Sequence, residues 1–326
     1  NTERMMQIDD NDPAPQMAIT DAIAVEGNSV VFDITLASVS AQPISFSYAT
    51  GSSTAVSGAD FTSRTGAMTF AAGQTLVQLS VPTINETLYE ADEIFVVNIS
   101  GYTAIVASSA IGTIQNNDTA PSIQWNVSAL SRNENAGLVT LKALLSTASG
   151  LPATVNYAVS GTAIPSVDHN ASAGTISIAA GQTSANLVVS IIDDFVDESN
   201  KTLILTMGGA SGASFGGVSV VTLTIIDDDT AAMSVANAQV SEGGLLLFVV
   251  SLNKPADSDI VASYMTSDGS ADATDYTSSS GSLTFLAGEQ SLTISIATNS
   301  DSDYELDETI IFDLSGYTPI LSAIAT

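Results

Sequence analysis

The chain has 326 residues, enough for about two to four domains, and it contains no cysteine, which excludes disulfides and thiolate metal sites. Hydrophobic residues make up 45% of it and charged residues only 13%, a balance that supports packed cores and argues against disorder. The 6 basic and 35 acidic residues give a net charge of −29, which excludes a basic nucleic-acid-binding surface and makes multivalent cations natural partners.

Alternation of apolar and polar residues predicts β-strands along the chain. In the first third, residues 30–36, 77–81 and 95–99 each place apolar side chains at every second position, and residues 292–296 do the same near the other end. Such strands bury one face. Turns rich in Gly, Ser, Asn and Asp separate them, and helical spacing is nowhere sustained. This pattern is typical of antiparallel β-sandwiches.

The chain also repeats itself. Matched acidic residues recur at intervals of 107 or 108 residues: Glu26, Glu134 and Glu242, and likewise Asp60, Asp168 and Asp275. An interval of this length is too long for a solenoid repeat and matches a whole small domain. We therefore predict three tandem sandwiches that form a rod.

Acidic clusters mark the boundaries of the repeats. They read QIDDNDPAPQM, TIQNNDTAPSI and IIDDDTAAMSV, and each follows a predicted strand. We place the repeats at residues 16–119, 120–230 and 231–326, with the third incomplete at its end. Residues 1–15 align with the end of a repeat, so we expect them to form the closing strand of a preceding one.

Two arrangements would complete these ends. The chain is either a window on a longer array, or residues 1–8 of one copy complete the third sandwich of another by strand addition. We favour the window because residues 320–326 already fill part of the position that the exchanged strand would need.

A second acidic cluster precedes one strand of each repeat and reads NETLYEADEIF, DDFVDESNKTL and DSDYELDETII. Charge confined to recurring places favours cation binding over simple solvation of acidic turns, which is the alternative interpretation. Calcium takes about six to eight oxygen ligands with flexible geometry, whereas zinc prefers nitrogen or sulfur. No EF-hand loop is visible, so we expect separate loops at one end of each sandwich to supply the ligands.

These motifs resemble the Calx-beta domain. The resemblance rests on SGADF, TGAMTFAAGQ and YEADEIF, on DATDY, SGSLTFLAGEQ and YELDETIIF, and on IIDDD, and it covers residues 16–326. It implies an all-β chain of three tandem immunoglobulin-like antiparallel β-sandwiches that form an elongated rod. Calx-beta domains bind clustered Ca²⁺ in the regulatory loop of the sodium–calcium exchanger, and tandem copies occur in large bacterial surface and adhesion proteins.

The resemblance also implies a set of calcium ligands. In the first repeat they are Glu26, Asp60, Glu86, Glu90 and Asp118. In the second they are Glu134, Asp168, Asp194, Glu198, Asp227, Asp228 and Asp229. In the third they are Glu242, Asp275, Asp301 and Glu305. We expect the fullest occupancy in the second repeat, because the first has Asn116 and Asn117 in place of aspartates and the third lacks its terminal acids.

Four other features are interpreted as having no part in binding or catalysis. The pairs Asp92–Glu93 and Asp307–Glu308 are interpreted as surface charge rather than ligands. His169 is expected to be a solvated turn residue, and Trp125 is expected to pack inside a sandwich.

We do not expect an enzyme, because one histidine and no cysteine leave few nucleophile–base pairs. We predict a calcium-stiffened structural segment of a stalk, adhesin or filament, extracellular or on a cell surface and bacterial in origin. The alternatives are an adhesin module that binds a sugar or protein, a strand-exchanged filament subunit, and a calcium sensor. The predicted partners are calcium, neighbouring repeats or further copies, and a host or surface ligand, without nucleic acid or membrane insertion.

Overall fold

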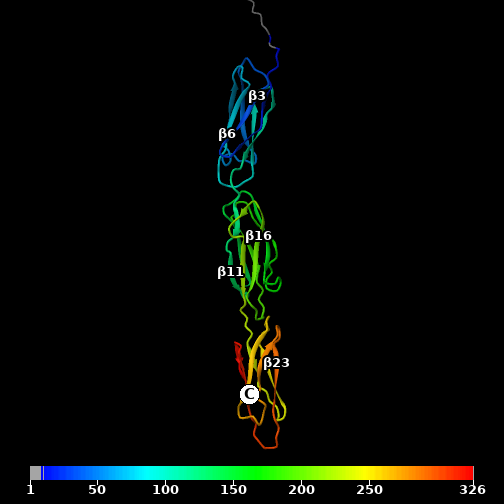
Figure 1. Ribbon diagram of the computed structural model, residues 1–326. Helices are drawn as coiled ribbons and strands as arrows, with labels where there is room; N and C mark the ends of the chain where they lie inside the picture. The colour runs from blue at the N-terminus through cyan, green and yellow to red at the C-terminus, as the bar shows by residue number, and fades with distance from the viewer. Residues whose placement is uncertain (1–8, 10, 326) are drawn as a thin grey trace, which may run out of the picture.

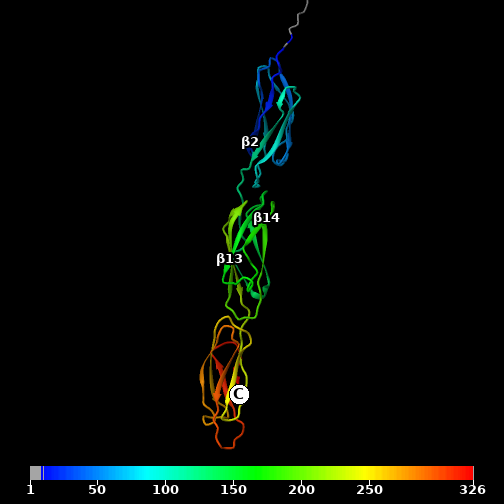
Figure 2. The same ribbon diagram turned by 90° about the vertical axis from the view of Figure 1, so that its right-hand side faces the viewer.

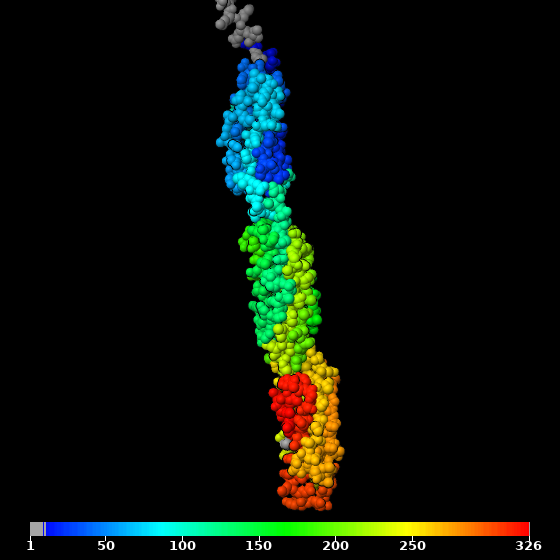
Figure 3. Space-filling view, turned by 60° about the vertical axis from the view of Figure 1, so that its left-hand side comes forward, coloured from blue at the N-terminus to red at the C-terminus, as the bar shows by residue number. Residues whose placement is uncertain are grey.

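The computed structural model describes residues 9 and 11–325. Of the segment 1–15 predicted as a closing strand, residues 1–8 and 10 lie outside the described residues, and residues 9 and 11–15 form no strand. The described chain consists of β-strands joined by turns, with one short 3-10 helix, η1 (Glu134–Ala136). Figures 1, 2 and 3 show three sandwiches placed end to end, in the order of the sequence. The all-β tandem fold predicted from the sequence is therefore confirmed. Among the described residues, no helix has the length and apolar character to cross a membrane.

Repeat 1 is a sandwich of two sheets. Its strands are β1 (Met17–Ile19), β2 (Ala22–Val25), β3 (Ser29–Leu36), β4 (Ile44–Ser52), β5 (Thr65–Phe70), β6 (Leu76–Pro82), β7 (Glu93–Ser100), β8 (Ile105–Ala107) and β9 (Ser109–Gln115). One sheet has the strand order β6-β3-β1-β8, and the other has the order β2-β9-β7-β4-β5.

Repeat 2 has the same two-sheet plan. Its strands are β10 (Ser122–Trp125), β11 (Ala129–Asn133), β12 (Leu138–Leu145), β13 (Ala153–Gly161), β14 (Gly174–Ile178), β15 (Ser184–Ser190), β16 (Lys201–Ser211), β17 (Ser214–Phe215) and β18 (Val220–Ile226). The sheet orders are β15-β12-β10-β17 and β11-β18-β16-β13-β14.

Repeat 3 has one opening strand where repeats 1 and 2 each have two. Its strands are β19 (Met233–Val235), β20 (Leu245–Leu252), β21 (Ile260–Asp268), β22 (Ser280–Phe285), β23 (Ser291–Ala297), β24 (Ile310–Ser315), β25 (Ile320–Ser322) and β26 (Ile324–Ala325). The sheet orders are β23-β20-β19-β25 and β22-β21-β24-β26, so β26 already pairs with β24 at the closing position.

Each sandwich has its own core, built from the alternating apolar positions. In β3 every second residue is buried, as the sequence pattern predicts. Phe95 stacks on Phe61 with ring centroids 4.5 Å apart and meets the edge of Phe32 at 5.8 Å. Trp125 is 1% exposed in the core of repeat 2, which confirms its predicted packing role.

Most strand pairs are antiparallel, but the opening strands depart from the prediction. In repeat 1, β1 pairs antiparallel with β3, whereas β2 runs parallel to β9 in the opposite sheet. The chain therefore changes sheets at Thr20 and Asp21. Asp21 Oδ1 fixes this crossing by accepting a hydrogen bond from Ile111 N at 2.7 Å. The parallel pairing has a direct consequence for the acidic residues that follow the two strands.

The expectation of a solvated His169 was wrong, because the side chain is fully buried. His169 forms a β-bridge with Ile191, as Phe61 does with Thr83 in repeat 1 and Tyr276 with Thr298 in repeat 3. It therefore fills the position of a core aromatic residue. Its Nδ1 accepts a hydrogen bond from the backbone of Ala171 at 3.0 Å, and its Nε2 has no hydrogen-bond partner.

Neighbouring repeats touch through equivalent loops at the two junctions. Tyr89, in the loop after β6, forms a parallel bridge with Ser149 of repeat 2. The Tyr89 carbonyl accepts hydrogen bonds from Gly150 N at 3.0 Å and from Ser149 Oγ at 3.1 Å. Asp197 forms the same type of bridge with Ala256 of repeat 3. The acidic loop of one repeat thus holds the next.

Candidate metal centres

Parallel strand pairing brings the first group of acids together. Because β2 runs parallel to β9 with Val25 opposite Gln115, the residues that follow both strands lie at the same end of the sheet. Glu26 directly follows Val25, and Asp118 lies three residues beyond Gln115. In repeat 2, β11 and β18 are paired in the same way. Acids far apart in the sequence are therefore neighbours in both repeats.

We name the group formed by Glu26, Glu86 and Asp118 the terminal subsite of repeat 1. One carboxylate oxygen from each residue lies within 4.8 Å of the others. Glu26 is buried, and its Oε1 accepts a hydrogen bond from Asn117 N at 2.8 Å. Asp118 Oδ2 is buried without a hydrogen-bond partner. Burial raises the pKa of Glu86, and the Glu26 carboxylate raises it further.

The terminal subsite of repeat 2 contains more carboxylates. Glu134, held by η1, lies with Asp194 and Asp229 in one group and with Asp193 and Asp228 in another, each with oxygens within 4.8 Å. Glu134 is 5% exposed, and its Oε1 has no hydrogen-bond partner, nor does Asp229 Oδ2. Burial raises the pKa of Glu134 to about 7, with the surrounding aspartates contributing in the same direction.

A second group of acids, which we name the turn subsite, lies nearby in repeats 1 and 3. Its members are, respectively, Asp60, Glu90 and Glu93, and Asp275, Glu305 and Glu308. Each aspartate is oriented by a backbone turn, because Asp60 Oδ2 accepts a hydrogen bond from Val56 N at 2.5 Å and Asp275 Oδ2 one from Asp272 N at 2.7 Å. Burial, followed by the Asp60 carboxylate, raises the pKa of Glu93 to about 7.

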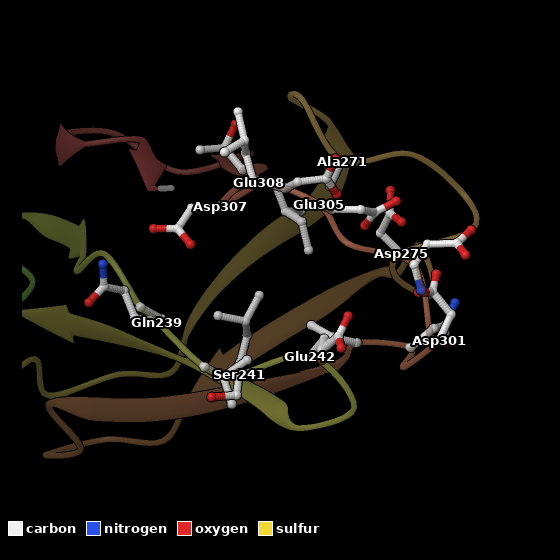
Figure 4. A pocket seen from close by; sticks show the side chains of 18 of the residues that line it. Gln239, Ser241, Glu242, Ala271, Asp275, Asp301, Glu305, Asp307 and Glu308 are labelled. Atoms are coloured by element: carbon white, nitrogen blue, oxygen red, sulfur yellow. The ribbon is translucent and has the colours of Figure 1, made fainter.

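In repeat 3 the acids surround an open depression, shown in Figure 4. Glu305 lies beside Asp275, and Glu242 lies on the opposite wall. The Asp301 carboxylate raises the pKa of Glu305. Glu242 and Asp301 occupy the place of the terminal subsite, but among the described residues neither belongs to a group of three acids with oxygens within 4.8 Å.

Repeat 2 differs at the turn subsite, because Lys201 stands where repeats 1 and 3 have Glu93 and Glu308. Lys201 Nζ lies 3.0 Å from Asp168 Oδ1 and 2.5 Å from Glu198 Oε2. Burial acts to lower the pKa of Lys201, but the hydrogen bonds to the two carboxylates outweigh it and raise that pKa. The expectation that repeat 2 has the fullest calcium occupancy stays a prediction, although at this subsite a lysine ammonium group lies where the other two repeats have a carboxylate.

Of the sixteen predicted ligands, eleven lie in the acidic groups and five lie elsewhere. The acidic groups contain Glu26, Asp60, Glu86, Glu90, Asp118, Glu134, Asp194, Asp228, Asp229, Asp275 and Glu305. Asp168 and Glu198 instead pair with Lys201. Asp227 Oδ2 accepts a hydrogen bond from Glu198 N at 3.2 Å, and the remaining two, Glu242 and Asp301, line the depression in repeat 3.

Three acids that were not predicted as ligands lie in these groups, namely Glu93, Asp193 and Glu308. Glu93 and Glu308 had been interpreted as surface charge, yet both lie beside the aspartate of the turn subsite. The signal that could have found them is Lys201, because a basic residue at the matching position of one repeat indicates that the charge of this position matters.

The three repeats match the profile of one known domain family. The profile of the Calx-beta domain matches residues 10–115, 116–229 and 227–319. The chain belongs to the Calx-beta domain family. Calx-beta domains are commonly calcium-binding and usually extracellular.

Individual relatives of these Calx-beta repeats are distant. The adhesion G-protein coupled receptor V1 of Danio rerio is 28% identical over 309 residues, which cover 84% of this chain and only 5% of the receptor. The crystal structure of CBD12 from CALX1.2 is 16% identical, with a TM-score of 0.32, and covers 64% of this chain and 99% of that one. The apo-form Calx CBD1 domain is 22% identical, with a TM-score of 0.33, and covers 34% and 100%.

The acidic groups of these Calx-beta repeats fit a hard dication. Their donors are all carboxylate oxygens, which calcium prefers. Asp118, Glu134 and Asp229 each hold a buried oxygen without a partner, and such an orphan acceptor costs free energy unless a cation or donor meets it. The turn subsite of repeat 2 does not fit an added ion, because an ammonium group already occupies it.

Proposed function

We propose that this chain is a calcium-stiffened structural segment of an extracellular stalk, adhesin or filament. The observation that carries the proposal is that the loop presenting the acids is the same loop that holds the next repeat. Glu90, in the turn subsite, directly follows Tyr89, whose carbonyl accepts the hydrogen bonds from Ser149 and Gly150. Order in this loop therefore affects both the acidic group and the junction.

Close packing connects the acids to the neighbouring repeat. A Cβ atom built on Gly150 would lie 2.5 Å from Glu90 Oε1 and 2.6 Å from Glu90 Cγ. Glu90 is thus pressed between its own turn subsite and the backbone of repeat 2. A displacement of the Glu90 side chain in repeat 1 would therefore change its contact with Gly150 of repeat 2.

The second junction has the same plan with added contacts. Asp197, next to Glu198, accepts a hydrogen bond from Ala231 N at 2.9 Å and so holds the first residues of repeat 3. Lys254 of repeat 3 forms an ion pair with Asp229 of the terminal subsite. This junction therefore shares a carboxylate with a candidate metal centre.

Repulsion among the acids supplies the reason for an ion. Burial and neighbouring carboxylates raise the pKa values of Glu86, Glu93 and Glu134, which means that the charged forms are unfavourable where they lie. Bound calcium would supply the positive charge that makes the charged forms favourable. The loops would then be held together instead of pushed apart, and the junctions would stiffen.

The remaining parts of the proposal follow from this role. We infer a cell-surface or extracellular location and a non-enzymatic function, in which neighbouring repeats and calcium are the main partners. The single histidine of the chain is buried in a core, where its packing role accounts for it. A bacterial origin and a host or surface ligand stay predictions from the sequence.

Two measurements on the 326-residue chain test the proposal. In millimolar Ca²⁺ the melting temperature should exceed that in excess EDTA, because an ion that binds only the folded state adds about 2.7 kcal/mol per site at 100 times its Kd. Small-angle scattering should show a narrower distribution of lengths with Ca²⁺. Equal melting temperatures would contradict calcium binding. A raised melting temperature with an unchanged scattering curve would show that calcium binds and would contradict only the proposed stiffening.

A further inference from the structure

We propose that Lys201 is a built-in cation that takes the place of a calcium ion at the turn subsite of repeat 2, so that this subsite is closed without metal. The inference rests on the proposed calcium binding of the corresponding subsites in repeats 1 and 3. It assigns different ion numbers to repeats that share one fold.

Lys201 lies at the position that Glu93 has in repeat 1 and Glu308 has in repeat 3. Glu93 is the first residue of β7 and Lys201 is the first residue of β16, and these strands occupy the same place in their sheets. Glu308 precedes β24 in repeat 3 by two positions. The position therefore holds an acid in two repeats and a base in the third, while the aspartate and the other glutamate of the subsite are kept in all three.

The contacts show that Lys201 engages the subsite directly. Its Nζ is shared by Asp168 and Glu198, and the exposed fractions of the three side chains are only 14%, 6% and 12%. Asp168 also keeps the backbone turn of its counterparts, because its Oδ2 accepts a hydrogen bond from Ile164 N at 2.5 Å. The remaining oxygen, Oδ1, faces the lysine where repeats 1 and 3 direct carboxylates toward one another.

Charge counting gives the same result. Three acids at the turn subsite of repeat 1 carry a formal charge of −3, and one bound dication would leave −1. Two acids and Lys201 in repeat 2 also carry −1 without any ion. Replacing a glutamate by a lysine changes the charge by the same amount as binding one calcium ion. A further dication would meet an ammonium group within hydrogen-bond distance of both carboxylates, and their repulsion opposes binding.

The two subsites of repeat 2 are therefore expected to differ in their need for calcium. Its terminal subsite, around Glu134, keeps a dense set of acids and orphan oxygens, and so depends on calcium. Its turn subsite, beside the junction residue Asp197, is closed by a side chain. The Asp197 and Glu198 part of the loop that holds repeat 3 is therefore expected to stay ordered in chelator. The part with Asp193 and Asp194, which belong to the terminal subsite, and the corresponding loop of repeat 1 are expected to lose order.

Reciprocal charge swaps in the 326-residue chain test this inference. The variant K201E gives repeat 2 the acid of its neighbours, and E93K gives repeat 1 the lysine. The control is K142E, which makes the same charge change at an exposed position of β12. Bound calcium is counted by equilibrium dialysis with the metal alone, and thermal unfolding is followed in EDTA and in Ca²⁺.

We expect K201E to bind one calcium ion more than the wild type, to melt at a lower temperature in EDTA and to recover in Ca²⁺. E93K should bind one ion fewer and melt at a higher temperature in EDTA. If K201E matches K142E in ion count and in EDTA melting, the inference is overturned. If the wild type binds no calcium, the proposed function fails, yet the opposite shifts of K201E and E93K in EDTA still decide the role of Lys201.

Discussion

Neutralising Glu134 should stabilise repeat 2 in chelator and destabilise it in calcium. The folded state raises the pKa of this buried carboxyl group from 4.5 to about 7, so it binds the proton more tightly than the unfolded state does. Between these two pH values the free energy of unfolding therefore falls as the pH rises. The loss is complete above pH 7 and corresponds to about 3 kcal/mol. The E134Q variant has an uncharged side chain at this position, so its stability should not fall with rising pH in this way.

The assay uses the one tryptophan of the chain. Trp125 lies in the core of repeat 2, so its fluorescence during urea unfolding reports on that repeat. At pH 8 in EDTA, E134Q should be more stable than the wild type by up to about 3 kcal/mol, and the difference should shrink toward pH 5. In saturating Ca²⁺ the order should reverse, because the variant has lost a ligand oxygen.

The matched control is E242Q, at the corresponding but exposed glutamate of repeat 3. It should leave the tryptophan transition unchanged at pH 8 and at pH 5 in EDTA and in saturating Ca²⁺. A wild type whose stability in EDTA is constant between pH 5 and pH 8 would refute the reasoning. So would an E134Q variant that is less stable than the wild type both with and without calcium.

Two further substitutions test the packing. G150A should weaken calcium binding in repeat 1 by roughly tenfold, about 1.4 kcal/mol, because the added methyl group displaces Glu90 from across the junction. Calorimetry measures the affinity. The control is G208A, whose methyl group would meet no atom within 4 Å. H169F should change the stability of repeat 2 by less than about 1 kcal/mol, because removing the unpaired Nε2 and restoring the ring found at Phe61 are offset by the loss of Nδ1, which accepts the hydrogen bond from Ala171 N. A fall in the urea midpoint that corresponds to more than about 2 kcal/mol would contradict this balance.

The sequence by itself determined the strands and the number of repeats. Alternation at residues 30–36 settles which side chains face the core, because a strand turns successive side chains to opposite faces. The constant interval between Glu26, Glu134 and Glu242 reveals tandem domains without any knowledge of their topology. Composition alone directs attention to hard cations, since −29 charges and no cysteine leave carboxylates as the available ligands.

Only the tertiary structure decided which acids meet. Glu26 and Asp118 are 92 positions apart, and the parallel pairing of β2 with β9 places them together, although local alternation does not reveal which strand will be a neighbour. Burial likewise separates Glu134, with its raised pKa, from the exposed Glu242 at the same position of the repeat. The partners of Lys201 are also set by the fold, because the sequence alone does not show that packing brings the Asp168 and Glu198 carboxylates to its ammonium group.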